Sequence, residues 1–477
     1  MMRKFLSRYH PRYVRSLVYM LQASEYSIRD YISWLHRVKD FTNVEQRKHL
    51  VTTPKAMAML FLVFATQMVL YGGVFSLLFL STSPIYIALF VCAFVLSPFI
   101  LAYGILLPLM LLQFFVQLPV TYFKFLHARK ILSHHKSVKI GIAGSFGKTS
   151  MRDILLTVLS EGKKTASPSG SYNTPLGISS FVKTLKGDEE VLIFEMGEYY
   201  RGDIAKLCNL VQPQIGIITG VNEAHFEKFK DIEETKKTIF ELAEYSKERP
   251  VYVNGENARA RAAAGRHHIL YERTGTRAWS VPHAQTGLSG TTFTLLHGDK
   301  RLEIKTKLFG LHHIGPLCVA ADIGLRLGLS YGQIERGLNK TKPFEHRLEP
   351  KTDQNGVVTL DDSYNGNPDG VVAVIDFLTS LSQHRRYYMT PGLVEMGTRT
   401  EAVHKEIGRK LADSGIEKVI LIKNSVTPYI EQGLRENSFT GEIIWYDDAR
   451  SAFSALPYLT VKGDVVLIQN DWPDQYA

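Results

Sequence analysis

The longest hydrophobic stretch of the chain lies between Lys55 and Lys124, where no Asp, Glu, Lys, Arg or His occurs. A transmembrane helix needs about 20 apolar residues, so this stretch has room for two, over residues 56–80 and 85–116, with a short polar break between them. A core helix of a soluble domain does not stay free of charge over such a length. The pattern therefore predicts an α-helical transmembrane hairpin within residues 56–123.

From residue 138 onward, short apolar runs alternate with amphipathic, helix-like segments. Val191-Leu-Ile-Phe194 and Ile215-Gly-Ile-Ile218 have the continuous hydrophobicity of strands buried on both faces of a parallel sheet. Such alternation is typical of α/β domains, whose ligands gather at the carboxyl ends of the strands. Over residues 139 to about 345 this alternation predicts an α/β domain, with bounds 124–345.

Positive charge is concentrated around the hydrophobic stretch. Residues 1–55 contain 11 Lys and Arg against 4 Asp and Glu, more basic residues follow Lys124, and the rest of the chain is close to neutral. Basic flanks on both sides of a hairpin place both flanks, and hence both termini and the α/β domains, in the cytoplasm. The location expected is the cytoplasmic membrane, with two membrane passes. This distribution favours a membrane surface as partner and argues against nucleic acid.

The basic segment over residues 1–55 leaves two interpretations open: helices lying on the cytoplasmic leaflet, or a small helical bundle. Its length before the hydrophobic stretch excludes a secretory signal peptide. Residues 122–139 are expected to form a basic linker. The cysteines, Cys92, Cys208 and Cys318, are too widely spaced to indicate a disulfide framework or a metal site.

The strongest chemical motif runs from Val138 to Ser150, where an apolar strand enters a glycine turn that ends in Lys148 and Thr149 at a helix start. This arrangement surrounds a polyphosphate with backbone N–H groups, a positive helix end and an ammonium. Lys148 would reach the terminal phosphates, and the Thr149 hydroxyl would bind Mg²⁺. The ATP-binding residues expected here are Gly144, Ser145, Gly147, Lys148, Thr149 and Ser150.

Polar residues stand where the two neighbouring strands end. Glu195 ends the first strand, and Asn222, Glu223 and His225 follow the second. A carboxylate and an imidazole opposite a phosphate loop are the groups that a Mg²⁺-nucleotide and a second cation would use. Considered alone, His225 is more ordinarily a hydrogen-bonded loop histidine.

Over roughly residues 138–471, a set of motifs occurs in a fixed order. They are Gly144-Ser-Phe-Gly-Lys-Thr-Ser150, Ser171-Tyr-Asn-Thr-Pro-Leu-Gly177, Phe194-Glu-Met-Gly197, Ala224-His-Phe-Glu227, Phe309-Gly-Leu-His312, Glu345-His-Arg-Leu-Glu349, Leu360-Asp-Asp-Ser-Tyr-Asn-Gly-Asn-Pro368 and Val394-Glu-Met-Gly397. In order and spacing this set resembles the Mur ligases, and within that family the branch that adds D-alanyl-D-alanine. The resemblance implies a P-loop-type central domain followed by a smaller, Rossmann-like α/β C-terminal domain over residues 346–477.

The resemblance also implies an ATP- and Mg²⁺-dependent amide-bond ligase. A bound carboxylate takes the γ-phosphate to give an acyl phosphate, and an amine then displaces phosphate. The residues agree with this chemistry, because phosphoryl transfer requires mainly positioning and charge neutralisation. By position, the resemblance assigns catalysis to Lys148, Glu195, His225 and Arg347, metal binding to Thr149, Glu195 and His225, acceptor binding to Asn173 and Thr174, and nucleoside binding to Asp362, Tyr364, Asn365 and Asn367.

The sequence departs from the family pattern at one residue and in two short segments. Ile239 stands where these ligases commonly carry a carbamylated lysine that supports a metal, so a neighbour substitutes or the second metal is held differently. Leu311-His-His-Ile-Gly-Pro316 lacks both asparagines of the adenine motif. Gln469-Asn-Asp-Trp-Pro-Asp474 replaces a Lys-Gly-Ser-Arg type loop that helps to hold the incoming substrate, which leaves the identity of the amine open.

A membrane hairpin also stands where this branch usually has a soluble domain for the UDP-sugar end of the precursor. Something must hold the non-reacting end of a substrate, and a bilayer would retain a lipid-linked precursor near the site. The expected function is therefore addition of an amino acid or dipeptide to a peptidoglycan-type cell-wall precursor, UDP- or lipid-linked, at the cytoplasmic membrane face.

Two alternatives stay open. The first is an amidating or polymer-forming ligase on another substrate, with an ammonia-supplying partner subunit, because no glutaminase motif is visible in this chain. The second is a membrane-anchored nucleotide-binding scaffold without catalysis, which Ile239 favours and the intact Lys148, Glu195 and Arg347 oppose.

Overall fold

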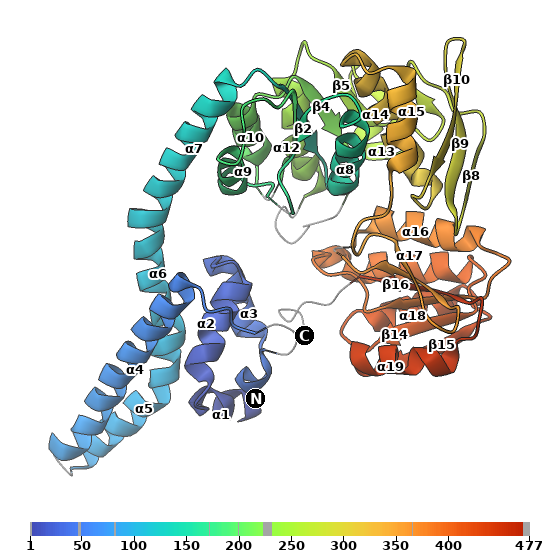
Figure 1. Cartoon of the computed structure of the whole chain (residues 1–477). Helices are drawn as coiled ribbons and strands as arrows, with labels where there is room; N and C mark the ends of the chain where they lie inside the picture. The colour runs from blue at the N-terminus through green and yellow to red at the C-terminus, as the bar shows by residue number, and fades with distance from the viewer. Residues whose placement is uncertain are drawn as a thin grey trace. The chain divides into compact units, whose positions relative to one another are not determined.

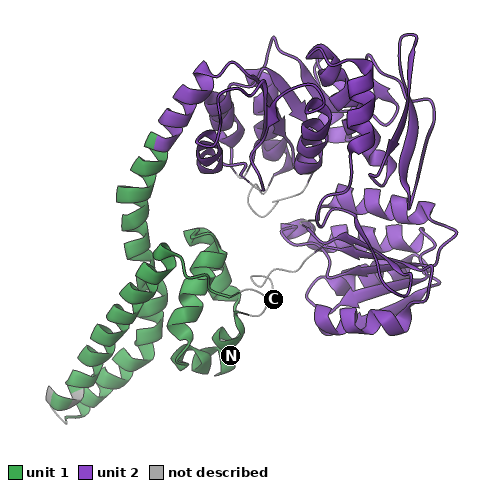
Figure 2. Cartoon of the chain, in the orientation of Figure 1, with its two compact units in different colours: residues 1–123, 472–477 green, residues 124–471 purple. Residues whose placement is uncertain are grey.

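The computed structural model describes residues 2–45, 49–80, 83–170, 172–198, 200–222, 231–364 and 366–470. The chain forms two compact units, whose boundary falls between Phe123 and Lys124 (Figure 2).

The first unit is helical (Figure 1). Apolar side chains of its N-terminal helices, among them Leu17, Met20 and Tyr31, are buried against Leu101 and Leu109 of the hydrophobic stretch. The segment before the hairpin is thus a small helical bundle that packs on the hairpin. The helices are α1 (Met2–Leu6), α2 (Tyr13–Ala23), α3 (Ile28–Arg37), α4 (Pro54–Leu80), α5 (Pro84–Gly104), α6 (Leu106–Leu112) and α7 (Leu118–His134), with 3₁₀ turns η1 (Ser7–Tyr9) and η2 (Phe41–Asn43) and a π-helical turn η3 (Gln113–Gln117).

Two prolines coincide with changes of geometry in the second long helix, whereas Pro98 lies within α5 without interrupting it. Proline has no N–H to donate to the carbonyl four residues earlier. The α-helical geometry is interrupted after Gly104, four residues before Pro108, and the π-helical turn η3 contains Phe115, four residues before Pro119. A π-helical turn absorbs such a missing bond without ending the helix.

The helix extends beyond Val116, where the second span was expected to end: α7 continues to His134. Most of the segment expected to be a basic linker is therefore helical. Its Lys, Arg, Leu and Ala residues are good helix formers. Within the described residues, two helices are long and apolar enough to cross a membrane, over residues 54–77 and 84–134.

The second unit begins with a seven-stranded sheet in the order β2-β3-β1-β4-β5-β6-β7, parallel except for β7. β1 lies between β3 and β4, so the chain changes direction across the sheet at the carboxyl end of β1, where ligands bind in such folds. The strands are β1 (Val138–Ala143), β2 (Thr165–Ala166), β3 (Val191–Glu195), β4 (Ile215–Ile218), β5 (Val251–Asn254), β6 (Ile269–Glu272) and β7 (Gly275–Thr276).

Helices and a small antiparallel sheet accompany this sheet (Figure 1). The fully buried residues of β1 and α8 form one core with those of α14 and α15. The elements are α8 (Lys148–Leu159), α9 (Pro175–Val182), α10 (Asp203–Val211), α12 (Ile232–Tyr245), α13 (Ala258–Ala263), η4 (Leu311–His313), α14 (Ile314–Arg326) and α15 (Tyr331–Lys340), with β8 (Ala284–Gly287), β9 (Gly290–His297) and β10 (Lys300–Thr306).

The C-terminal part has a six-stranded sheet in the order β11-β12-β16-β13-β14-β15, in which only β11 is antiparallel to its neighbour. The expected α/β fold class is thus confirmed. The elements are β11 (Glu349–Thr352), β12 (Val358–Asp362), α16 (Pro368–Ser380), β13 (Arg386–Thr390), η5 (Gly397–Arg399), α17 (Thr400–Ala412), β14 (Lys418–Ile422), α18 (Thr427–Glu436), β15 (Glu442–Tyr446), α19 (Ala449–Leu459) and β16 (Val465–Gln469).

Candidate functional site

A glycine turn connects β1 to α8 and forms the predicted phosphate loop. Gly144 and Gly147 have φ angles of 144° and 72°, which favour glycine. A Cβ at Gly144 would lie 2.2 Å from Oγ1 of Thr219, the residue that follows β4. No larger residue fits there, so the turn stays tight and leads directly into the first turn of α8 at Lys148.

The Lys148 ammonium is held inside the site by a carboxylate. Its Nζ donates to the Gly144 carbonyl and to both oxygens of Glu198, at 3.1 and 3.0 Å. The Glu198 side chain is only 2% exposed and that of Lys148 13%. The sequence analysis missed Glu198, although it stands three residues beyond Glu195, just past the carboxyl end of β3.

Glu195 lies against the first turn of α8. The Thr149 hydroxyl donates to its Oε2 at 3.0 Å. Nη1 of Arg152 is 2.7 Å from its Oε1, yet this buried oxygen accepts no hydrogen bond within the described part of the chain. Burial raises the pKa of Glu195, and the nearby Arg152 and Lys148 cations oppose that rise.

Arg152 is a second site residue that the sequence analysis missed. It is buried, and its guanidinium donates to Asp153 at 2.8 Å and to the carbonyls of Pro168 and Gly170 at 3.3 and 2.9 Å. These contacts fix the guanidinium beside Glu195. The sequence position one helical turn after Lys148 was the available clue.

These residues fit a Mg²⁺-nucleotide. Oε1 of Glu195 retains acceptor capacity, the Thr149 hydroxyl is adjacent, and hard oxygen donors are what Mg²⁺ prefers. The glycine turn, the N-terminus of α8 and the Lys148 ammonium fit a polyphosphate.

The two residues expected to bind the acceptor differ in their surroundings. Asn173 lies against the turn after β3: its carbonyl accepts from the Gly197 N–H at 2.9 Å, and a Cβ on Gly197 would lie 2.9 Å from the Asn173 side chain. The Thr174 hydroxyl instead caps α9 by accepting from the Gly177 N–H at 3.2 Å. Asn173 is therefore next to the carboxylates, whereas Thr174 has a structural partner.

Asn222 connects the phosphate loop to the C-terminal domain. Its N–H donates to the Ser145 hydroxyl at 3.2 Å, and its buried side-chain amide donates to Asn367 at 2.8 Å and to Asp369 at 2.7 Å. Asn367 also caps α16 through the Gly370 N–H. Ser145 and Asn367, both expected to bind ATP, thus belong to one hydrogen-bonded chain.

The remaining C-terminal site residues form a second group. The Arg347 guanidinium lies 4.9 Å from the centre of the Tyr364 ring. Asp362 accepts from Gln469 at 3.0 Å and from the Leu348 N–H at 3.3 Å. Burial raises the pKa of Asp362 to about 6, against the lowering effect of Gln469 and Arg347.

Two expected site residues, His225 and Asn365, lie outside the described residues. Ser150 lies in the first turn of α8 and is half-buried. Ile239 is fully buried in the apolar core that includes Phe194 and Leu242. The position that the family pattern gives to a metal-supporting lysine therefore offers no ligand here.

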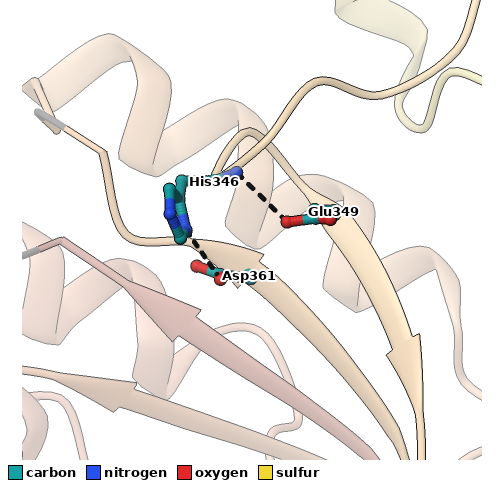
Figure 3. Close-up of side chains that lie close together, drawn as sticks. All are labelled: His346, Glu349 and Asp361. Atoms are coloured by element: carbon teal, nitrogen blue, oxygen red, sulfur yellow. Dashed lines mark hydrogen bonds and ion pairs between the residues drawn. The ribbon is translucent and has the colours of Figure 1, made fainter.

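A second group of metal-type ligands lies at the start of the C-terminal domain. Figure 3 shows His346 and Asp361 joined by a hydrogen bond of 2.9 Å, with Glu349 beside them. The Lys351 ammonium is 2.8 Å from Asp361 and 3.1 Å from Glu349, so it already occupies the position of a cation. We interpret this group as an ion-pair network.

Comparisons with known proteins agree with this geometry. The family model of the Mur ligase middle domain matches residues 142–323, and that of the Mur ligase glutamate ligase domain matches residues 346–469. A UDP-N-acetylmuramoyl-tripeptide--D-alanyl-D-alanine ligase from Mycobacterium bovis is 30% identical over 295 residues, 59% of this chain and 58% of that protein. The chain thus spans less than two thirds of this relative.

Two solved structures share the fold. A MurF ligase from Thermotoga maritima in complex with ADP has a TM-score of 0.64 at 23% identity and covers 74% of this chain and 80% of that one. MurF from Acinetobacter baumannii has a TM-score of 0.66 at 18% identity, over 75% and 78% of the two chains. Since the two family models together match most of the second unit, this chain belongs to the Mur ligase family.

Proposed function

We propose that the chain is an ATP-dependent carboxylate–amine ligase that adds an amino acid or a dipeptide to a peptidoglycan-type precursor. The observation that carries this proposal is the Lys148–Thr149 phosphate loop facing the buried Glu195 carboxylate at the carboxyl end of the adjacent strand. The name of the Mycobacterium bovis relative supports D-alanyl-D-alanine as the incoming dipeptide and a UDP-N-acetylmuramoyl-tripeptide as the acceptor.

The reaction proceeds in two displacements. An oxygen of the acceptor carboxylate bonds to the γ-phosphorus while the bond to the β-γ bridging oxygen breaks and ADP leaves. The amine nitrogen then bonds to the acyl carbon, phosphate leaves, and the nitrogen loses a proton. Bound Mg²⁺ would supply charge neutralisation at the phosphates, with Thr149, Glu195 and His225 as its protein ligands.

This chain's own residues position and neutralise charge. Lys148 would bind the β- and γ-phosphates, and Arg347 would approach the γ-phosphate from the C-terminal domain. Asn173, beside the turn after β3, would orient the acceptor. Asp362 and Tyr364, with Asn365 and Asn367, would contact the nucleoside.

The test is whether release of ADP from ATP requires both a carboxylate and an amine. We expect Lys148→Ala to lower this turnover by about 100-fold or more, while hydroxylamine added to the wild type traps the acyl phosphate as a hydroxamate. Turnover that is unaffected by Lys148→Ala, or that needs neither substrate, would exclude the ligase and favour the scaffold.

We further propose that residues 56–123 anchor the enzyme in the membrane as two transmembrane helices, with residues 1–55 and both α/β domains (124–345 and 346–477) on the cytoplasmic face. Support comes from the charge-free stretch and from exposed apolar side chains along it, among them Phe61, Met68, Phe79, Ile85 and Phe115. Such a surface is stable in lipid and aggregates in water.

Flotation of the full chain with liposomes tests the anchor. We expect the protein to float with the vesicles and to resist extraction by carbonate or high salt. Release by salt alone would show that only the basic residues attach it. A lipid-linked acceptor, compared with its UDP-linked form in the same vesicles, tests whether the bilayer retains the substrate.

The second candidate function is ligation of an amine other than D-alanyl-D-alanine, and the contacts of Gln469 favour it. Both ends of its side-chain amide are occupied, since its N–H donates to Asp362 and its carbonyl accepts from Tyr388. A neutral amide whose nitrogen already donates to Asp362 offers an incoming carboxylate no positive charge, whereas a lysine would. Product masses from a panel of amines, including ammonia and D-alanyl-D-alanine, decide between these substrates.

A further inference from the structure

We propose that Glu198 is a second carboxylate ligand for the divalent cation that accompanies ATP. In the absence of nucleotide, the Glu198 carboxylate pairs with the Lys148 ammonium instead. The inference rests on the proposed function, because it assigns a role within the same nucleotide site. Glu198 is not one of the residues that the family resemblance identifies.

The first observation is burial. The Glu198 carboxylate is 2% exposed, and both of its oxygens accept from the Lys148 ammonium, at 3.0 and 3.1 Å. Lys148 is also the residue placed to bind phosphate. The Lys148 ammonium therefore pairs with the Glu198 carboxylate before ATP binds and with a phosphate of ATP afterwards.

Binding of phosphate to Lys148 weakens its pairing with Glu198. A buried carboxylate without a counter-ion is strongly unfavourable, and it is relieved by protonation or by a cation. ATP normally binds together with a divalent cation. The cation that the nucleotide brings is the available replacement for Lys148.

The second observation is a buried carboxylate oxygen three residues away that has an ion pair but no hydrogen bond. Oε1 of Glu195 lies 2.7 Å from Nη1 of Arg152 and accepts no hydrogen bond from any described residue. Glu195 and Glu198 flank the turn that follows β3, and Asn173 packs against Gly197 within that turn. Two carboxylates and the Thr149 hydroxyl thus present oxygen atoms to the same end of the phosphate loop.

The experiment measures binding rather than turnover. Affinity for a non-hydrolysable ATP analogue is determined on the full-length protein with and without Mg²⁺, and Mn²⁺ affinity of the analogue complex is measured by electron paramagnetic resonance. For Glu198→Gln we expect tighter metal-free binding of the analogue, because a competing anion is gone, and a loss of Mn²⁺ affinity of about tenfold or more.

Glu190→Gln is the matched control. Glu190 is a glutamate of the same domain whose half-exposed carboxylate pairs with Lys163 at 3.2 Å, so neither affinity should change. Glu198→Asp keeps the charge on a shorter side chain and should recover part of the Mn²⁺ affinity. It also provides the comparison if the Gln variant is unstable.

Two outcomes overturn different statements. If Glu198→Gln strengthens analogue binding equally with and without metal and leaves Mn²⁺ affinity unchanged, Glu198 is only a counter-ion for Lys148 and the inference fails. If the wild-type protein binds no nucleotide at all, the proposed ligase function fails instead.

Discussion

Two clusters of this molecule contain similar residues but differ in burial. The phosphate-loop cluster (Lys148, Arg152, Glu195, Glu198) and the C-terminal cluster (His346, Glu349, Lys351, Asp361) both place basic groups between carboxylates. Side chains of the first are 2–13% exposed. In the second, Lys351 is 52% exposed, His346 45% and Glu349 32%, and only Asp361, at 13%, is comparably buried.

Burial determines what each cluster can do. Water stabilises exposed charges whether or not they are paired, so an exchange of partners changes little. Buried charges depend on their partners, and a ligand that replaces one partner shifts the whole group. The comparison indicates a ligand-responsive site in the first cluster and a structural network in the second.

The largest effect is expected for Arg152→Met. This change removes the cation that lies 2.7 Å from the buried Glu195 carboxylate. The loss should cost about 3 kcal/mol of unfolding free energy, and ATP turnover should be lost. The control is Arg301→Met, which removes an exposed pair with Glu303 at 2.6 Å and should leave the unfolding free energy nearly unchanged. Denaturant unfolding measures both, and equal losses would contradict the comparison.

The consecutive carboxylates Asp361 and Asp362 should respond oppositely to pH. Burial raises the pKa of Asp362 to about 6, so its ionised form destabilises the fold above that pH. Asp362→Asn should therefore stabilise the protein at pH 8, by about 1–2 kcal/mol. This advantage should disappear as the pH falls from 6 towards 4.

Asp361→Asn is the matched variant on the opposite face of β12. Burial would raise the pKa of Asp361, but hydrogen bonds from Lys351, Ser363 and His346 lower it to about 2. Its ionised form therefore stabilises the fold at neutral pH, and this stability is lost only as the pH falls towards 2. Thermal unfolding at pH 8 should show Asp361→Asn less stable than the wild type; the same sign for both variants would refute the assignment.

The smallest effect is expected for Lys351→Met. Its pairs with Glu349 and Asp361 are partly exposed, so the loss of unfolding free energy should be below about 1 kcal/mol and ATP turnover should not change. Calorimetric titration with Mn²⁺ should detect no binding to this cluster in the wild type. A metal-dependent rise in wild-type stability that Lys351→Met strengthens would show a cation site instead.

The sequence predicted what depends on neighbours along the chain. The phosphate loop follows from Gly144, Gly147 and Lys148, and the buried strands β3 and β4 follow from their hydrophobic runs. It could not predict the Glu198–Lys148 pair, because that contact joins two segments 50 residues apart. The helical continuation to His134 was missed because the basic residues were interpreted as a linker, although they are also good helix formers.

The hydrogen bond between Ser145 and Asn222 relates the phosphate loop to the contact between the two α/β domains. Asn222 contacts the phosphate loop through its backbone N–H and the C-terminal domain through its side chain. If a bound phosphate displaced the Ser145 hydroxyl, the residue that loses a hydrogen bond would be the same one that joins the two α/β domains. Two hydrogen bonds on Asn222 thus connect the phosphate loop to the contact between these domains.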